Sequence, residues 1–217
     1  MCTSTNSASK HPSKLVKHVE YVPTISIAFT SLILIVHHRD SIVYSIVCGV
    51  MEFVKLSPHD DVVHDISFDF YGRRFATCAS DKRIKVWDLV EETGEWTCYD
   101  INRAHNDSIW RLSWAHPEFG QLIASCSEDK SICIWEEQES VTLLKTEQRD
   151  RWQKKVQLTD SKKSVNDVKF APRHLGLKVA AASADGTVRI YEATDVFSLN
   201  YWQLQVNEGS AIAFYWE

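Results

Sequence analysis

The alternation of apolar and polar residues is clearest between positions 105 and 136. Three short apolar runs lie there, separated by a His-Pro turn region and a Glu-Asp-Lys turn, at 109–114, 122–126 and 131–135. Side chains of a strand point alternately to its two faces, so a period of two in short runs is typical of strands and not of helices. The pattern therefore predicts a three-stranded antiparallel meander.

The same pattern occurs twice more, at 59–88 and at 164–192. In each copy a turn aspartate is followed six residues later by an aromatic residue: Asp81 with Trp87, Asp129 with Trp135, and Asp185 with Tyr191. The aspartates are 48 and 56 residues apart, near the roughly 40 to 50 residues of a propeller-blade repeat once linkers are allowed for. These three copies of the sequence pattern resemble the WD-repeat signature and predict three blades.

In the WD-repeat pattern, a loop histidine, a strand hydroxyl, a turn aspartate and a strand indole form one hydrogen-bonded set. The first two copies carry the whole set: His59, Thr77, Asp81 and Trp87, then His105, Ser125, Asp129 and Trp135. An unpaired buried polar group costs about 1 to 3 kcal/mol, so a set that satisfies itself fixes the register of its blade.

The third copy keeps Asp185, but Ser161 falls near the histidine position, Ala181 replaces the hydroxyl and Tyr191 replaces the indole. We therefore expect the third blade to depend more on apolar packing, by Val165, Val168, Phe170, Val179, Val188 and Ile190.

Serine, histidine and aspartate together also suggest a catalytic triad. A nucleophile site is needed once, whereas this arrangement recurs at blade spacing and ends in an indole, so a structural role is favoured. No glycine-rich phosphate loop or isolated carboxylate pair is present, and His37 and His38 have no third ligand at a suitable spacing. We expect no enzymatic activity, no cofactor and no metal.

Composition narrows the function further. The 217 residues are 44% hydrophobic and 24% charged, enough for one globular unit with an ample core. A net charge of -5 gives no basic surplus for nucleic acid. The six cysteines form no Cys-x-x-Cys pair, and four lie in or beside strand runs, which is typical of small buried hydrophobic residues in a reducing compartment.

Residues 1–50 do not belong to the repeats. The first 17 are rich in Ser, Thr and Lys, which predicts disorder. The apolar run 24–36 has thirteen residues, fewer than the roughly 20 that span a bilayer, and polar residues 37–40 follow it. Cysteine usage argues against a secretory signal. A hairpin of two strands and an added leader unrelated to the fold are the alternatives, and we do not expect membrane contact.

Residues 51–56 resume the alternation as a short strand before the first blade. We expect blades at about 59–101, 105–158 and 164–206, and the start of a further blade at 211–217. Stable propellers have about four to eight blades, so the predicted fold class is all-β: an incomplete WD-repeat propeller of about three blades plus a strand, with an open edge.

Specific stretches go beyond a generic WD repeat. They are HDISFDFYGRR at 64–74, WAHPEFG at 114–120, VKFAP at 168–172, SADG at 183–186 and IYE at 190–192. Residues 51 to about 206 closely resemble the Seh-type nucleoporins, which are relatives of the Sec-thirteen coat propellers. Arg73-Arg74, Asp195-Val196 and Trp202 favour the Seh-type branch.

The resemblance implies a non-enzymatic scaffold at the nuclear pore, in its outer-ring Y complex, with roles in mRNA export and protein transport. In this family a partner nucleoporin inserts a blade into an open six-bladed propeller, a form of β-augmentation. The alternative assembly is the amino-acid-sensing GATOR complex at the lysosomal membrane surface. Our candidate receiving edge is Phe53, Val54, Lys55 and Leu56, with its neighbours in the first blade.

Two departures from the family bear on partner binding. The family begins near Met51, so residues 1–50 are an extension that would block the receiving edge. The family also continues for about three more blades, so we expect a truncated or alternatively spliced product. A generic WD-repeat adaptor is the competing function: it would bind a peptide through its top loops, for example at Arg111 or Glu128.

Overall fold

The structure is a computed structural model that describes residues 31–36, 42–47, 50–55, 59–138 and 151–209. It divides into two compact units, 1–55 and 56–217. Among the described residues, no helix is long and apolar enough to cross a membrane.

The described part of the first unit is an antiparallel sheet of three strands in the order β1, β2, β3. These are β1 (Ser31–Val36), β2 (Ile42–Val47) and β3 (Val50–Lys55). The two apolar runs of the N-terminal region thus form the strand pair that was one of the alternatives. β3 pairs with β2 along its whole length and is a strand of this sheet, so it is not part of the first blade.

The second unit contains three antiparallel four-stranded sheets, each formed by consecutive strands. The first blade consists of β4 (Val63–Phe68), β5 (Arg74–Ala79), β6 (Ile84–Val90) and β7 (Glu95–Ile101). The second consists of β8 (Ile109–Trp114), β9 (Leu122–Ser127), β10 (Ile132–Glu137) and β11 (Trp152–Leu158). The third consists of β12 (Val165–Phe170), β13 (Lys178–Ser183), β14 (Thr187–Ala193) and β15 (Trp202–Gly209).

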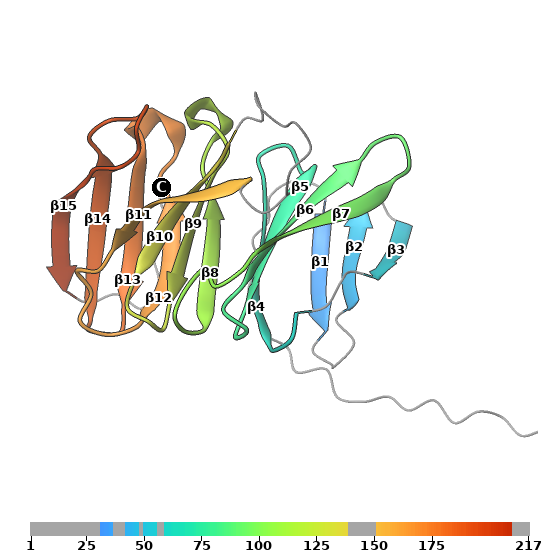
Figure 1. Cartoon of the computed structure of the whole chain (residues 1–217), viewed down its shortest axis with the longest axis horizontal. Helices are drawn as coiled ribbons and strands as arrows, with labels where there is room; N and C mark the ends of the chain where they lie inside the picture. The colour runs from blue at the N-terminus through green and yellow to red at the C-terminus, as the bar shows by residue number, and fades with distance from the viewer. Residues whose placement is uncertain (1–30, 37–41, 48–49, 56–58, 139–150, 210–217) are drawn as a thin grey trace, which may run out of the picture. The chain divides into compact units, whose positions relative to one another are not determined.

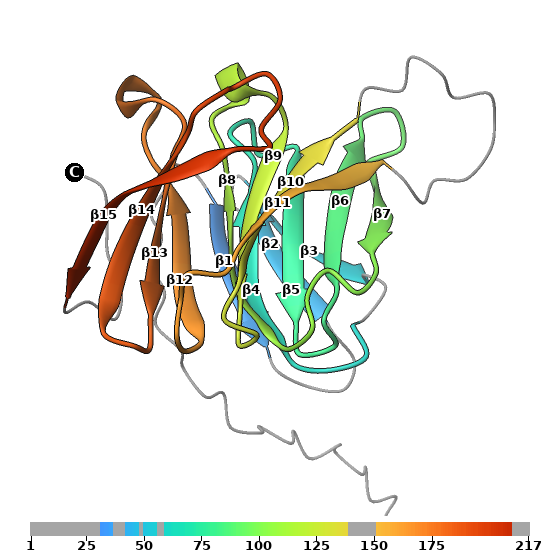
Figure 2. The same cartoon turned by 60° about the vertical axis from the view of Figure 1, so that its left-hand side comes forward.

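The first strands of the three blades lie next to one another and run in the same direction. The bonds that join β8 to β4 include Leu112 N–H to the Asp65 carboxylate (2.8 Å) and Trp114 Nε1 to Ser67 O (2.8 Å). Phe170 N–H of β12 donates to Ser113 Oγ at 3.0 Å. Parallel innermost strands with a sheet extending outward from each are the arrangement of propeller blades (Figure 2).

The core lies between the blades in two clusters of buried side chains. One joins the first and second blades and includes Val86, Leu112 and Trp135. The other joins the second and third blades and includes Ile134 and Val168. The two clusters cover both faces of the second blade, and its central strand β9 is therefore buried at every position.

All blades have the same two ends. At the hairpin end the first strand turns into the second, through residues 69–73, 115–121 and 171–177, and the third turns into the fourth (upper end of Figure 1). At the opposite end, called here the histidine end, lie residues 59–62, 80–83, 102–108, 128–131, 159–164 and 184–186. Short 3-10 helices, η1 (Pro117–Phe119) and η3 (Arg173–Leu175), form two of the hairpin-end turns.

The prediction of an all-β, incomplete propeller is confirmed, since three blades do not close a ring. Residues 211–217, where the next blade was expected to start, lie outside the described residues, as do Leu56, His37, His38 and the whole of the predicted disordered region 1–17.

Candidate functional site

The first blade brings its four predicted residues together at the histidine end. His59 Nδ1 lies 2.8 Å from Asp81 Oδ2, and His59 Nε2 lies 2.8 Å from Thr77 Oγ1. Trp87 Nε1 donates to the same Thr77 Oγ1 at 3.2 Å. The His59 and Asp81 side chains are only 3% and 4% exposed, so each polar atom depends on the others for a partner.

The second blade repeats this geometry. His105 Nδ1 lies 3.1 Å from Asp129 Oδ2, and its Nε2 lies 2.7 Å from Ser125 Oγ. Trp135 Nε1 donates to Ser125 Oγ at 2.9 Å, and Ser125 in turn donates to Cys133 O at 3.4 Å. The single serine hydroxyl therefore links the imidazole, the indole and the backbone.

Electrostatics in the second blade favour a charged pair. Burial is the largest single effect and opposes protonation of His105, but hydrogen bonds and charge interactions with Asp129 and Cys133 together outweigh it and raise the pKa of His105 to about 9. Burial likewise opposes ionisation of Asp129, yet hydrogen bonds from His105 and Ser131 lower its pKa below the usual range. At neutral pH the pair is an imidazolium bound to a carboxylate.

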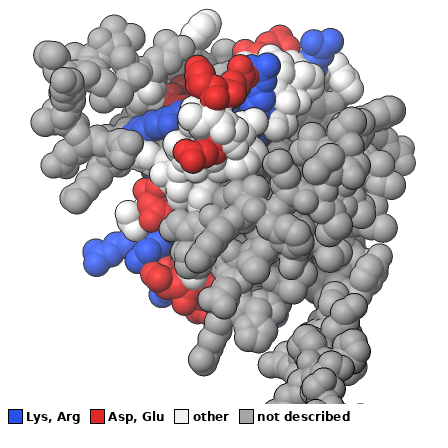
Figure 3. Space-filling view, turned by 90° about the vertical axis from the view of Figure 1, so that its right-hand side faces the viewer, with Lys and Arg blue, Asp and Glu red and all other residues white. Residues whose placement is uncertain are grey.

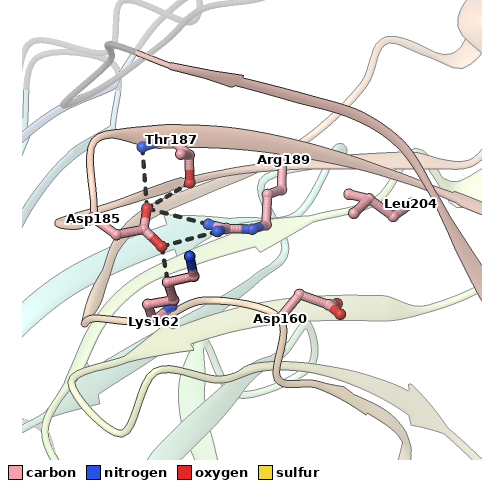
Figure 4. Close-up of a pocket in the computed structure, with 6 residues that line it drawn as sticks. All are labelled: Asp160, Lys162, Asp185, Thr187, Arg189 and Leu204. Atoms are coloured by element: carbon pink, nitrogen blue, oxygen red, sulfur yellow. Dashed lines mark hydrogen bonds and ion pairs between the residues drawn. The ribbon is translucent and has the colours of Figure 1, made fainter.

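The third blade replaces the histidine with an arginine from within the sheet. Arg189 of β14 contacts both carboxylate oxygens of Asp185, with NH2 to Oδ2 at 2.9 Å and NH1 to Oδ1 at 3.3 Å (Figure 4). Arg189 NH1 also donates to Ser161 Oγ at 3.3 Å, and Tyr191 Oη donates to Asp160 Oδ2 at 3.1 Å. The third blade thus has its own polar network and does not rely on packing alone.

The apolar positions expected to carry the third blade are divided between its faces. Val165, Val168, Phe170 and Val179 are buried, in the cluster shared with the second blade. Val188 and Ile190 are only half-buried, because their side chains point to the other face of β14.

Sequence reasoning missed Arg189. The available signal was that a cation lies four residues after the turn aspartate and two before Tyr191, in the one repeat that lacks the histidine. The other repeats have Lys85 and Cys133 at this position, so alignment alone did not mark it.

A cleft of about 330 Å³ adjoins this third-blade network (Figure 4). Its lining is Asp160, Lys162, Asp185, Thr187, Arg189 and Leu204. The Asp185 carboxylate and the Arg189 guanidinium that line it are bonded to each other. The described residues contain no group of three His, Cys, Asp or Glu residues placed to hold a metal ion.

A second unpredicted feature joins the first two blades. Arg74 of β5 binds Asp88 of its own blade (2.6 Å) and Glu137 of the second blade (2.5 and 3.0 Å). Its guanidinium also lies 5.6 Å from the ring centroids of Trp114 and Trp152. Such a fork matches a carboxylate and stacks on indoles, so Arg74 ties the blades together at the hairpin end.

The two candidate residues of the adaptor hypothesis also have partners, but Arg111 lies in β8 and not, as was expected, in a loop. Arg111 NH1 lies 3.6 Å from Asp65 Oδ1, and Glu128 accepts a hydrogen bond from Trp110 Nε1 at 3.0 Å. On the side shown in Figure 3, described carboxylates and cations are interspersed and form no large basic patch.

The candidate receiving edge is described through its backbone. β3 pairs with β2 from Val50 opposite Val47 to Lys55 opposite Ile42. No other described strand pairs with β3, so one of its edges is taken and the other has no described partner.

Known proteins resemble this chain closely. Nucleoporin SEH1 from Bos taurus is 54% identical over 147 residues, which are 68% of this chain and 41% of that protein. The Homo sapiens protein of the same name is 53% identical over 147 residues, with the same shares, and the Danio rerio protein is 52% identical over 147 residues, 68% of this chain and 40% of that protein. The chain thus spans about two fifths of the length of these relatives.

The family described as WD domain, G-beta repeat matches residues 52–88, 96–136 and 152–192. Each match begins in a strand that precedes a blade (β3, β7 or β11) and continues through the first three strands of the next blade. Because these matches cover more than half of the chain and follow the repeats of the structure, the chain belongs to the WD domain, G-beta repeat family.

Proposed function

We propose that this chain is a non-enzymatic scaffold subunit of the nuclear pore, in the outer-ring Y complex, with a role in mRNA export and protein transport. The observation that carries the proposal is the 53% identity with the human protein named Nucleoporin SEH1 over 147 residues. The repeated histidine and aspartate sets support a structural role, because each is bonded within its own blade.

The proposed mode of binding is β-augmentation, in which a partner nucleoporin adds a blade at β3. One family match begins in β3, and the other two begin in β7 and β11, which are the outermost strands of their blades. β3 would then be the outer strand of a blade whose remaining strands come from the partner. Backbone ladder bonds would provide affinity and side-chain pockets would provide specificity.

In this chain β2 occupies one edge of β3, and we infer that a partner blade would pair at this edge. A partner must therefore displace the β1–β2 hairpin before it can pair there. The N-terminal extension acts in this proposal as a competitor for the receiving edge.

Co-purification with a Y-complex nucleoporin that carries an insertion blade tests the proposal. The full chain and a version starting at Met51 are compared side by side. We expect a stoichiometric complex with the shorter chain and little or none with the full chain. Absence of a complex with both would contradict the proposal.

An adaptor that binds peptides at the histidine end is the competing function, favoured by the exposed Glu128 in that end's loops. Charge reversal Glu128→Lys should leave the nucleoporin complex intact if β3 is the receiving edge. Loss of that complex with Glu128→Lys and not with a β3 variant such as Val54→Pro would favour the adaptor. A stoichiometric complex with GATOR subunits, and none with the Y-complex nucleoporin, would assign the scaffold to the lysosomal assembly instead.

A further inference from the structure

Exposed apolar side chains are unevenly distributed between the two ends of the blades. Among the described residues, most of the large apolar side chains that are exposed lie at the hairpin end, including Phe70 and Tyr71, each 64% exposed, and Phe197, 92% exposed. At the histidine end the loops carry mainly charged and polar residues, and Val62 is the exposed apolar side chain there among those described. Contiguous exposed apolar surface on one end marks an interaction site.

Three rings at this end form a contiguous group, the Phe70 cluster, made of Phe70, Tyr71 and His116. The Phe70 and Tyr71 centroids are 5.2 Å apart at an interplanar angle of 88°, and Phe70 and His116 are 4.8 Å apart at 67°. Phe70 and Tyr71 belong to the turn between β4 and β5, whereas His116 precedes η1. The cluster therefore spans the first and second blades.

The fold does not need these rings in order to hold the turn. Asp69 Oδ1 accepts hydrogen bonds from the backbone N–H groups of Arg73 and Arg74, each at 3.0 Å. Gly72 supplies the positive φ of 69° that the turn requires. Burying an aromatic side chain is favourable, and two adjacent rings forgo most of that gain here.

Negative charge borders the Phe70 cluster. The neighbouring hairpin-end turns of the first two blades carry Asp69, Glu91, Glu92 and Glu118. The Glu91 and Glu118 side chains are 61% and 60% exposed. Arg73 is the one Lys or Arg residue in these described turns, and it is paired with Glu91 at 2.6 Å. The ring faces add further negative potential through their quadrupoles.

We propose that the Phe70 cluster is a docking site for a protein segment that carries Lys or Arg residues beside apolar side chains. The apolar side chains of such a segment cover Phe70 and Tyr71, and its cations lie over the ring faces and beside Glu118. This site is formed by turns of the first and second blades, whereas the proposed blade insertion uses the edge of β3. Either proposal can therefore fail while the other stands.

A pair of model peptides tests the chemistry on the full chain. One is an amphipathic Leu/Lys helix of about 18 residues, or five turns, and the other has Glu in place of each Lys. Fluorescence anisotropy of the labelled peptides measures binding. We expect the Leu/Lys peptide to bind at least about tenfold more tightly than the Leu/Glu peptide, and its binding to weaken at about 0.5 M salt, where surface charges are screened.

Three variants locate the site. Phe70→Ser with Tyr71→Ser should weaken Leu/Lys binding at least about tenfold, because aromatic anchors dominate such interfaces. Glu118→Lys keeps the rings and should weaken Leu/Lys binding about threefold. This variant tests the site if the double variant does not fold. The matched control Val62→Ser removes an exposed apolar side chain at the opposite end and should change nothing.

Several results would overturn the proposal. Equal binding of the Leu/Glu peptide would show that apolar contact alone is responsible. Unchanged binding by both the double variant and Glu118→Lys, or an equal loss in Val62→Ser, would place the contact elsewhere. Ring-dependent binding to phosphatidylcholine vesicles, with no peptide binding, would assign the surface to lipid and end the proposal for a protein segment.

Discussion

The second and third blades neutralise their turn aspartates with different cations. In both, the turn aspartate receives two backbone N–H groups: Asp129 from Asn106 and Ser131, and Asp185 from Lys162 and Thr187. The neutralising group is the imidazole of His105 in one blade and the guanidinium of Arg189 in the other. The constant element of a blade is therefore the aspartate that ties its turn to its loop, and the source of positive charge is interchangeable.

The two solutions differ in how they respond to pH and in how the strand aromatic residue is connected. The protonated His105 can lose its proton as pH rises and uses its second nitrogen to reach Ser125, whereas an arginine guanidinium stays charged. In the second blade Trp135 bonds to the same Ser125, while in the third Tyr191 bonds to Asp160, apart from the set formed by Asp185, Arg189, Ser161 and Thr187.

Arg189→Ala should have the largest effect. The Arg189 and Asp185 side chains are 5% and 8% exposed, and removing one member of a buried ion pair leaves the other charge uncompensated. We expect a loss of about 3 to 5 kcal/mol in the free energy of unfolding. Urea denaturation followed by tryptophan fluorescence measures it. A loss below about 1 kcal/mol, as for a surface pair, would show that the third blade rests on apolar packing.

Raising the pH should weaken the second blade and not the third. The folded-state pKa of His105, about 9, lies above its unfolded value near 6.5, so its contribution is complete below pH 6.5 and is lost as pH rises through 9. With about 1.4 kcal/mol for each pKa unit, the loss is on the order of 3 kcal/mol. Urea denaturation from pH 6.5 to 9.5 measures the change.

His105→Gln is the control for this pH dependence, because glutamine bonds but does not titrate. The variant should be less stable than the natural chain at pH 6.5 and nearly level with it at pH 9.5. An identical pH slope in both proteins would assign the titration to another group.

Ser125→Ala should cost about 1 to 3 kcal/mol, because the buried His105 Nε2 and Trp135 Nε1 donors lose their shared acceptor. The reciprocal change, Ala181→Ser in the third blade, should not raise the free energy of unfolding, since the third blade has neither an imidazole nor an indole to bond with the new hydroxyl. The difference between their unfolding midpoints measures this asymmetry. Stabilisation by Ala181→Ser would contradict it.

Tyr191→Phe should have the smallest effect, about 1 kcal/mol or less. Its hydroxyl donates to Asp160, whose side chain is exposed and stays hydrated after the bond is lost. Trp135→Phe is the matched change in the second blade and should cost more, because its acceptor Ser125 is fully buried. Melting temperatures of the two variants give the comparison, and equal shifts would remove the distinction between the blades.

Residues with fixed spacing were predictable from the sequence. The hydroxyl, aspartate and indole of the first two sets lie at the same offsets in both repeats, and the histidine lies two residues farther from them in the second. Alternating apolar residues mark the strands between them. Successive side chains of a strand point to opposite faces with a strict period of two, so the local sequence was enough to predict β8, β9 and β10.

Arg189 and Arg74 were not predictable in this way. Each has a partner whose position depends on how the chain folds back: Asp185 across a tight turn, and Glu137 on the neighbouring blade. The repeat pattern assigned no role to either arginine, because it describes what the copies share and these residues are where they differ.

The sequence by itself determined the repeating unit: strands, turns and the aspartate-centred sets, all of which follow from side-chain alternation and short offsets. Only the tertiary structure decided which cation neutralises each aspartate, how Arg74 joins two blades, that β3 pairs with β2, and which apolar side chains remain exposed at the hairpin end. The physical reason is that burial and charge pairing depend on distances between segments far apart in the chain, and those distances exist only after the sheets have packed.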